Sequence, residues 1–131
     1  MKALGTVING LLQGDISIRN MTKGKIFPNI APQATEKDTY IVYNIHDVAV
    51  NSCQNGSVIH AMYSVFIGSP LYKTTDALGD LVRARLDRYK GTVNEIDVTA
   101  IKYLDEVEDF VFEERLNGMQ QEYKITIYQK N

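Results

Sequence analysis

Hydrophobic residues recur along this 131-residue chain with two different periods, and the changes of period predict the order of helices and strands. Residues 1–14 carry apolar side chains at the three-and-four spacing of an amphipathic helix. These positions are Leu4, Val7, Ile8 and Leu11. Gly14 suits the end of this helix, and Asp15 can cap a further short turn that reaches Ile18.

Apolar and polar residues alternate in the next two runs, 39–50 and 57–68, which are rich in β-branched and aromatic side chains. The alternating apolar positions are Ile41, Tyr43, Ile45, Ile59, Ala61, Tyr63, Val65 and Ile67. Asn55 and Gly56, between the runs, are a turn signal. The two runs therefore predict an antiparallel hairpin whose odd-numbered residues face the core.

A second helical pattern occupies residues 74–91, where Thr74 or Thr75 can cap the start and Gly91 suits the end. Its apolar stripe consists of Leu78, Leu81, Val82, Leu86 and Tyr89. Alternation then returns and predicts three strands, at 95–104, 108–114 and 121–129. The sequence Leu-Asn-Gly at 116–118 is typical of a turn.

The resulting order, α-β-β-α-β-β-β, predicts an α+β fold in which both helices pack on one face of a mostly antiparallel sheet. The length of the chain favours a single domain over residues 1–131. The residues that we expect to be buried together are Ile59, Val65, Leu81, Val82, Leu86, Ile96, Val98, Ile125 and Ile127.

Charge and cysteine content limit the classes of function. With 16 acidic and 14 basic residues the formal net charge is −2, which gives no general attraction to nucleic acid or to anionic membranes. The single cysteine, Cys53, cannot form an internal disulfide or a thiolate zinc site by itself. No segment reaches the roughly 20 apolar residues of a membrane-spanning helix, and we interpret the N-terminus as an amphipathic helix of a cytosolic protein.

The two histidines are candidates for metal binding. If the predicted hairpin turns symmetrically about Cys53, His46 and His60 lie directly opposite each other on the face away from the core. Zinc normally takes three or four protein ligands, so the two histidines alone are not enough, and a third ligand is hard to find. The alternative is that both are polar residues of an exposed or interfacial sheet face. Cys53 has no base close to it in this arrangement, so a simple turn cysteine is favoured.

An acidic run surrounds the predicted strand 108–114. It contains Asp105, Glu106, Glu108, Asp109, Glu113 and Glu114. Paired carboxylates can perform acid–base catalysis in a cleft, but alternation along a strand favours a solvated face. No phosphate-binding loop or other cofactor motif is present, so the sequence predicts no cofactor.

The segment GKIFPNIAPQ, residues 24–33, carries the most specific resemblance. Together with the strand YIVY, residues 40–43, it resembles the tail completion family of long-tailed phages, prophages and gene-transfer agents, in which G-(R/K)-(I/V)-(Y/F)-P…A-P-Q precedes P-Y-(V/I)-V-Y. The run DALGDLVRARLD, residues 76–87, is similar to the helix of that family. EVEDFVF, at 106–112, and YKITIYQ, at 123–129, resemble its closing strands. Thr39 departs from the family, which commonly has proline there, and the loop ATEKD before it, residues 34–38, is charged.

The resemblance implies a virion protein without enzymatic activity that forms a ring, of six subunits, at the head-proximal end of the tail tube. Its partners would be the tail tube protein and head connector proteins, in the host cytoplasm during assembly and then in the virion tail. A proline-stiffened arm loses little entropy on docking. We therefore expect a subunit interface at Phe27, Pro28, Asn29, Ile30, Ala31, Pro32 and Gln33, although a simple connector would explain the same residues.

The acids Glu108, Asp109, Glu113 and Glu114 are candidates for the lumen of such a ring, which must let DNA pass without holding it. The alternative is that they keep the outer surface soluble. Two other functions stay open. One is a different virion part, such as a head-completion or minor tail protein, and the other is a small metal-dependent or acid–base enzyme that uses His46, His60 and the acidic run.

Overall fold

The computed structural model describes residues 2–29, 38–111 and 116–130, which form three helices and one six-stranded sheet. The helices are α1 (Lys2–Gln13), α2 (Ile16–Thr22) and α3 (Tyr72–Leu86). The strands are β1 (Ile26–Pro28), β2 (Tyr40–Cys53), β3 (Gly56–Ser69), β4 (Gly91–Val93), β5 (Ile96–Val111) and β6 (Leu116–Lys130). This arrangement confirms the predicted α+β class.

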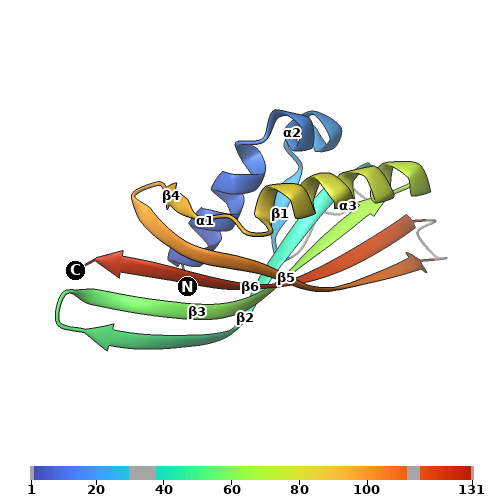
Figure 1. Ribbon diagram of the computed structural model, residues 1–131. Coiled ribbons are helices and arrows are strands. Elements are labelled where there is room, and N and C mark those ends of the chain that lie inside the picture. The colour runs from blue at the N-terminus through green and yellow to red at the C-terminus, as the bar shows by residue number, and fades with distance from the viewer. Residues whose placement is uncertain (1, 30–37, 112–115, 131) are drawn as a thin grey trace.

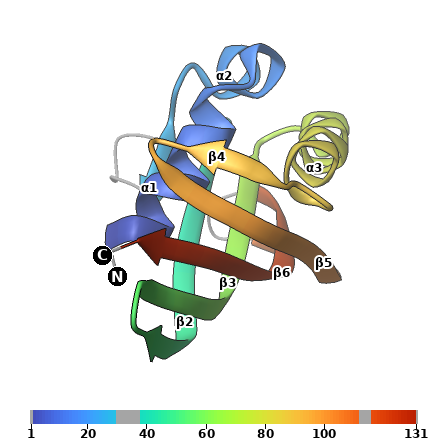
Figure 2. The same ribbon diagram turned by 60° about the vertical axis from the view of Figure 1, so that its left-hand side comes forward.

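The sheet has the strand order β1-β2-β3-β6-β5-β4, and every neighbouring pair is antiparallel except the parallel pair of β1 and β2. Figure 1 shows the helices together on one side of the sheet, and the turned view in Figure 2 shows a strong twist of the strands. We call the helix side the covered face and the other side the open face. Among the described residues, no helix packs on the open face.

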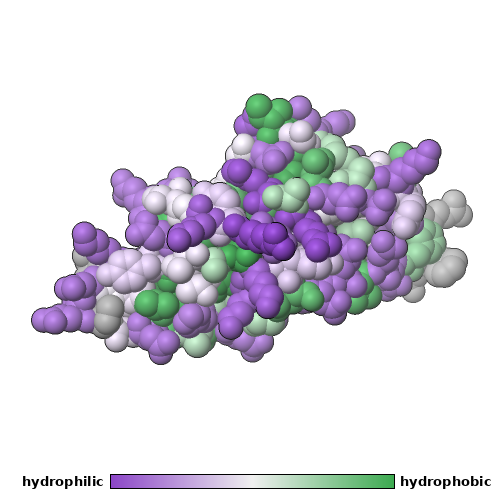
Figure 3. All heavy atoms as spheres, in the orientation of Figure 1, coloured by the Kyte–Doolittle hydropathy of each residue, from purple (hydrophilic) through white to green (hydrophobic). Residues whose placement is uncertain are grey.

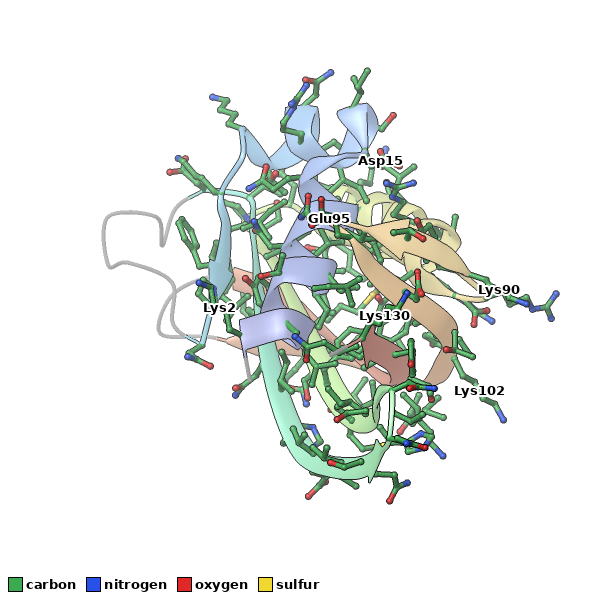
Figure 4. The ribbon with its side chains drawn as sticks, turned by 90° about the vertical axis from the view of Figure 1, so that its left-hand side faces the viewer. Lys2, Asp15, Lys90, Glu95, Lys102 and Lys130 are labelled. Atoms are coloured by element: carbon green, nitrogen blue, oxygen red, sulfur yellow. The ribbon has the colours of Figure 1, made fainter. Side chains whose placement is uncertain are left out.

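The core lies between α1, α3 and the covered face. The predicted apolar positions Leu4, Val7, Ile8 and Leu11 of α1 are at most 1% exposed, so the helical period identified the buried stripe correctly. The odd-numbered residues of β3 are buried from Ile59 to Ile67, as the two-residue period predicted. Of the residues expected to be buried together, Leu81 and Ile96 are only partly buried and the others are buried. Figure 4 shows side chains filling the space between the helices and the sheet, while the labelled Lys90 and Lys102 point outward.

The ends of the first two helices follow the sequence signals. α1 stops at Gln13, and the Gly14 N–H donates to the Gly10 carbonyl at 3.0 Å. Asp15 is the N-cap of α2, where its carboxylate accepts a hydrogen bond from the Ile18 N–H at 3.0 Å. The short turn predicted as far as Ile18 extends to Thr22.

The predicted limits of α3 were wrong. The helix begins at Tyr72 without a side-chain cap, and Thr75 is buried with its hydroxyl directed to the Leu71 and Asn117 carbonyls. It ends at Leu86, not at Gly91, because the Asp87 carboxylate leaves the helix to accept the Tyr103 N–H at 3.0 Å.

Two strand predictions also need correction. The runs 95–104 and 108–114 belong to one continuous strand, β5, as far as Val111. Residues 116–118 are not a turn but the start of β6, where Leu116 pairs with Val111 and Gly118 with Asp109. Two short strands, β1 and β4, add to the ends of the sheet beside β2 and β5.

A buried polar group ties α3 to the sheet. Gln121 of β6 is fully buried, and its side-chain amide donates to the Gly79 carbonyl of α3 at 2.9 Å. The Tyr123 hydroxyl donates to Oε1 of Gln121 at 2.7 Å. The Tyr123 ring stacks on Tyr63, with centroids 5.2 Å apart and planes 12° apart. Because a buried amide needs partners, these contacts fix the position of α3 on the sheet.

Candidate interaction surfaces

The first candidate surface is the proline-containing segment, of which the structure describes Phe27, Pro28 and Asn29. Phe27 and Pro28 belong to β1 and pair with Val42 and Tyr43 of β2. The Asn29 N–H donates to the Tyr43 carbonyl at 2.9 Å, and Asn29 then turns the chain with a φ of 67°. The other predicted interface residues, Ile30, Ala31, Pro32 and Gln33, lie outside the described residues.

The described start of this segment, residues 26–28, is therefore an edge strand. Proline has no N–H to offer a further strand, so Pro28 suits the outermost position of a sheet. Lys25, just before β1, forms an ion pair with Asp38, just before β2. The contact holds the two ends of the segment 26–37 together, and it lowers the pKa of Asp38 through its hydrogen bond from Lys25.

The edges of the sheet are the second candidate surface. β1 pairs only with residues 41–43 of β2, and β4 pairs only with residues 96–98 of β5. The loop after α3 occupies the next backbone groups on the outer side of β5. The Ile101 carbonyl accepts the Arg88 N–H at 2.8 Å, and the Tyr103 N–H donates to the Asp87 carboxylate. No described strand pairs with the outer side of residues 45–52 or 104–110. We call these two stretches the β2 edge and the β5 edge.

The described part of the acidic run, residues 105–109, lies on the β5 edge, where it accepts hydrogen bonds from nearby groups. The Asp105 carboxylate accepts the Glu106 N–H at 2.7 Å, and the Asp109 carboxylate accepts the Phe110 N–H at 2.8 Å. Glu108 accepts a hydrogen bond from the Tyr72 hydroxyl of α3 at 3.2 Å. The sequence did not identify these roles, because which N–H groups point outward depends on the strand order. The available signal was the presence of two aspartates inside a strand, where this residue is rare.

The predicted lumen acids are only partly described. Glu108 and Asp109 are exposed, and as neighbours in a strand they point to opposite faces, Glu108 to the covered side and Asp109 to the open side. Glu113 and Glu114 lie outside the described residues.

The open face carries a polar network that crosses three strands. His46 of β2 lies 3.3 Å through Nε2 from the Ser64 hydroxyl of β3, and this hydroxyl donates to Glu122 of β6 at 2.7 Å. Nδ1 of His46 lies 3.0 Å from the Asp47 carboxylate. The hydrogen bond to Asp47 is the main cause that raises the pKa of His46, and the charges of Asp47 and Glu122 add to it against partial burial.

The prediction that the two histidines face each other was wrong. The hairpin turns at Gln54–Asn55, with Cys53 paired to Gly56, and an irregularity between His46 and Ala49 shifts the register. His46 therefore pairs with Met62, while His60 pairs with Ala49 and contacts Thr126 at 3.0 Å. Among the described residues, no group of three or more His, Cys, Asp and Glu side chains could hold a metal ion.

The contacts of His46 resemble in outline those of a Ser-His-Asp triad, but the hydrogen bonds point elsewhere. The Ser64 proton is directed to Glu122 and not to His46, so the imidazole does not act as a base toward this hydroxyl. The network also lies on an exposed sheet face, with the His46 side chain 43% exposed. Catalytic centres commonly exclude water, which an exposed sheet face does not do. No described helix is long and apolar enough to span a membrane.

Comparison with known proteins identifies a similar fold. A chain of a solved structure described as "Virion of native gene transfer agent (GTA) particle" superposes with a TM-score of 0.75. The alignment covers 96% of this chain and 97% of that chain, at 13% sequence identity. No model of a known protein family matches the sequence, and no curated protein matches it significantly. The two chains therefore share their fold over almost their whole length.

Proposed function

We propose that this chain is a structural protein of a phage-like particle that completes the tail and joins it to the head as a ring. The observation that carries the proposal is the likeness, over 96% of the chain, to the fold of a protein in a gene transfer agent virion. The resemblance of segment 24–33 to the tail completion family supports the specific place that we propose in the particle. Its partners would be the tail tube protein and the head connector proteins.

The site geometry is consistent with a role in assembly. On the open face, His46, Ser64 and Glu122 contact one another. The four carboxylates of the β5 edge accept hydrogen bonds from the backbone, from Tyr72 of α3 or from Gln121 of β6, so these contacts are within the fold and not around a substrate. Figure 3 shows hydrophilic side chains over most of one side of the molecule, with hydrophobic atoms in small patches. Such a surface suits a protein that is soluble before assembly and then makes contacts through its edges.

The test is deletion of the gene in a cell that produces particles. We expect DNA-filled heads and separate tails, and joined particles again when the gene is supplied on a plasmid. Gold-labelled antibody should mark the head-proximal end of the tail. Label on isolated heads with normal tails would favour a head-completion protein, and joined, infectious particles without the gene would refute the proposal.

The proline-containing segment can be tested separately. Deletion of residues 29–33 should leave a folded chain, judged by circular dichroism, that no longer joins heads to tails. Replacement of residues 34–37 by Gly-Ser-Gly-Ser keeps the chain length and serves as the control. If the deletion variant still gives infectious particles, the segment is a simple connector.

The lumen role of the acids predicts a salt-dependent effect. Reversal of Glu113 and Glu114 to lysine should give intact particles that eject DNA slowly, and more slowly at low salt, because lysine–phosphate contacts weaken as salt rises. Reversal of Asp76 and Asp80, exposed on α3, is the matched control. Normal ejection at every salt concentration would leave only the role in solubility.

A further inference from the structure

The two strand edges that no described strand covers lie at opposite sides of the sheet and near opposite ends of its long strands. The β2 edge, residues 45–52, runs toward the turn at 54–55, and the β5 edge, residues 104–110, runs toward the other end of the sheet (Figure 1). Each is the half of a long strand that its short neighbour leaves uncovered. An unpaired strand offers a row of N–H and C=O groups to which another strand can add.

Exposed apolar side chains concentrate on these edges. Eight large hydrophobic residues among those described are exposed, and five of them belong to the two edges. These five are Val48, Val50, Leu104, Val107 and Phe110, with exposures from 40% to 59%. Two others, Leu71 and Tyr72, lie at the start of α3, and Tyr72 contacts Glu108 of the β5 edge. This distribution is typical of a contact surface.

The ladder shows which backbone groups point outward. In an antiparallel pair, alternate residues bond to the partner strand and the residues between them turn their N–H and C=O away. Ile101 and Tyr103 turn outward to the 87–88 loop. The irregularity between Tyr103 and Asp105 shifts this alternation, so the next outward residues are Glu106, Glu108 and Phe110.

Two of these outward N–H groups are occupied by the chain itself. The Asp105 and Asp109 carboxylates accept the N–H groups of Glu106 and Phe110 at 2.7 and 2.8 Å. These are the groups that an added strand would need. The aspartates therefore cap N–H groups that an added strand would need. Charged side chains on an edge strand are also a recurrent protection against uncontrolled pairing.

Charge decides which strand can add there. The β5 edge has four carboxylates, Asp105, Glu106, Glu108 and Asp109, and no basic residue. Two β5 edges side by side would place eight carboxylates in one ladder, and like charges opposite each other are destabilising. The β2 edge has one carboxylate, Asp47, beside Val48, Ala49 and Val50. A β2 edge is thus the better partner that this same chain provides.

We propose that the β5 edge of one copy pairs with the β2 edge of a second copy, and that Asp105 and Asp109 keep the β5 edge closed until pairing displaces them. The inference deepens the proposed ring and rests on it for its biological setting. The contact itself can be tested on the purified chain, apart from any particle.

The strand directions support a head-to-tail arrangement. β2, β3, β6 and β5 alternate in direction across the sheet, so β2 and β5 run opposite ways and copies placed side by side form an antiparallel pair. Such a contact uses two different patches on each copy and closes into a ring or continues as a filament. Because the two edges lie toward opposite ends of the sheet, successive copies are staggered. A stagger closes into a ring when the strands tilt against its axis.

The first experiment measures the caps. Asp105→Ala with Asp109→Ala frees both N–H groups and removes two charges. Asp105→Asn with Asp109→Asn removes the same charges but keeps a side-chain oxygen that can accept each N–H. In sedimentation velocity, the alanine pair should self-associate with an affinity at least about tenfold higher than wild type, and the asparagine pair should stay near wild type. If the alanine pair fails to fold, Asp109→Ala alone replaces it.

The second experiment identifies the partner edge. In a Cys53→Ser chain, Asn51→Cys and Val107→Cys each place one thiol on the open face of one edge. The two single-cysteine chains, also carrying the alanine pair, are mixed and treated with a short bis-maleimide. Head-to-tail pairing predicts that the mixed 51–107 product dominates. Ala100→Cys replaces Val107→Cys as the control. Ala100 lies on the same open face of β5, but next to the part of the strand that pairs with β4, so it should give only the background level of cross-linked product.

Three results would overturn the proposal: equal association of the alanine and asparagine pairs, no gain in the alanine pair over wild type, or 51–51 and 107–107 products in place of the mixed one. The outcome is separable from that of the proposed function. The mixed product can form in a chain whose gene is dispensable for joining heads to tails, and a chain needed for joining can lack the mixed product.

Discussion

Two stacked tyrosines in the core make a matched test of the buried polar group. Tyr63 and Tyr123 are both fully buried, with rings 5.2 Å apart, but only one hydroxyl is satisfied. Tyr123 donates to Gln121, whereas the Tyr63 hydroxyl has no hydrogen-bond partner among the described residues. The same change, Tyr→Phe, should therefore have opposite signs at the two positions.

The magnitudes follow from hydrogen-bond energetics. A buried polar group without a partner costs about 1–3 kcal/mol, so Tyr63→Phe should raise the free energy of unfolding by up to this amount. Tyr123→Phe keeps the stacked ring but leaves Oε1 of the buried Gln121 without this donor, which should lower the free energy of unfolding by about 1–3 kcal/mol. Both phenyl rings keep the stacking contact, so the aromatic contribution cancels in the comparison.

Urea unfolding followed by far-UV circular dichroism measures both variants, with an unchanged slope against urea as the sign that the compact state is preserved. Burial raises the pKa of both tyrosines well above the usual value. The contribution of these two tyrosines to the free energy of unfolding is therefore fully present below the unfolded pKa of about 10 and is lost as pH rises above it. The double Tyr→Phe variant should lose less free energy of unfolding over the same pH range. A loss of stability in Tyr63→Phe, or no loss in Tyr123→Phe, would refute this account of the core.

Three further outcomes are expected. Leu86→Ala should lower the free energy of unfolding by about 2–5 kcal/mol, because Leu86 is fully buried. Leu81→Ala should lower it by less, because Leu81 is only partly buried. Asp15→Ala removes the N-cap of α2 and should cost about 0.5–2 kcal/mol by thermal or urea unfolding. The raised pKa of His46 gives stability that is present below the unfolded pKa of about 6.5 and is lost as pH rises through the folded value; His46→Gln should flatten this small slope in a pH series of unfolding curves.

The periodicity of the sequence identified the covered face because burial of one face fixes the parity of a strand. Slipping by one residue would move Ile59, Tyr63 and Ile67 from the core to solvent, so the alternation had one low-energy solution. The same argument is weaker where a strand extends past the helices. Val48, Ala49 and Val50 form a continuous apolar run, and the irregularity between His46 and Ala49 places an extra residue there that alternation does not reveal. The predicted pairing of the histidines failed at this point.

The candidate surfaces were predictable in composition but not in role. Pro28 and the acids at 105–109 were recognised in the sequence, and they lie on β1 and β5 at or near a sheet border. That Asp105 and Asp109 occupy outward N–H groups follows from the strand order, in which β4 covers only residues 96–98 of β5. A strand order with non-consecutive neighbours such as β3 and β6 depends on long-range packing, which local patterns do not contain.

Gly118 shows why a turn signal failed inside a strand. It pairs with Gly68 across β3 and β6, and the Phe66 ring lies on the open face against both. A Cβ at Gly118 would come within 2.8 and 2.9 Å of two ring atoms of Phe66. Here glycine provides space for an aromatic ring and not a positive φ, and the sequence alone does not separate these two uses.

This explanation predicts a change of sign that depends on Phe66. Gly118→Ala in the wild-type chain should lower the free energy of unfolding by about 1–3 kcal/mol, since the ring must move. In a Phe66→Ala background the same change should raise it by about 0.5–1 kcal/mol, because alanine loses less backbone entropy than glycine in a strand. Gly5→Ala is the control: no atom of the described residues lies within 4 Å of a Cβ placed at this position, so it should stabilise α1 in both backgrounds. Equal effects of Gly118→Ala with and without Phe66, measured by urea unfolding, would mean that the glycine is there for its backbone and that the ring is incidental.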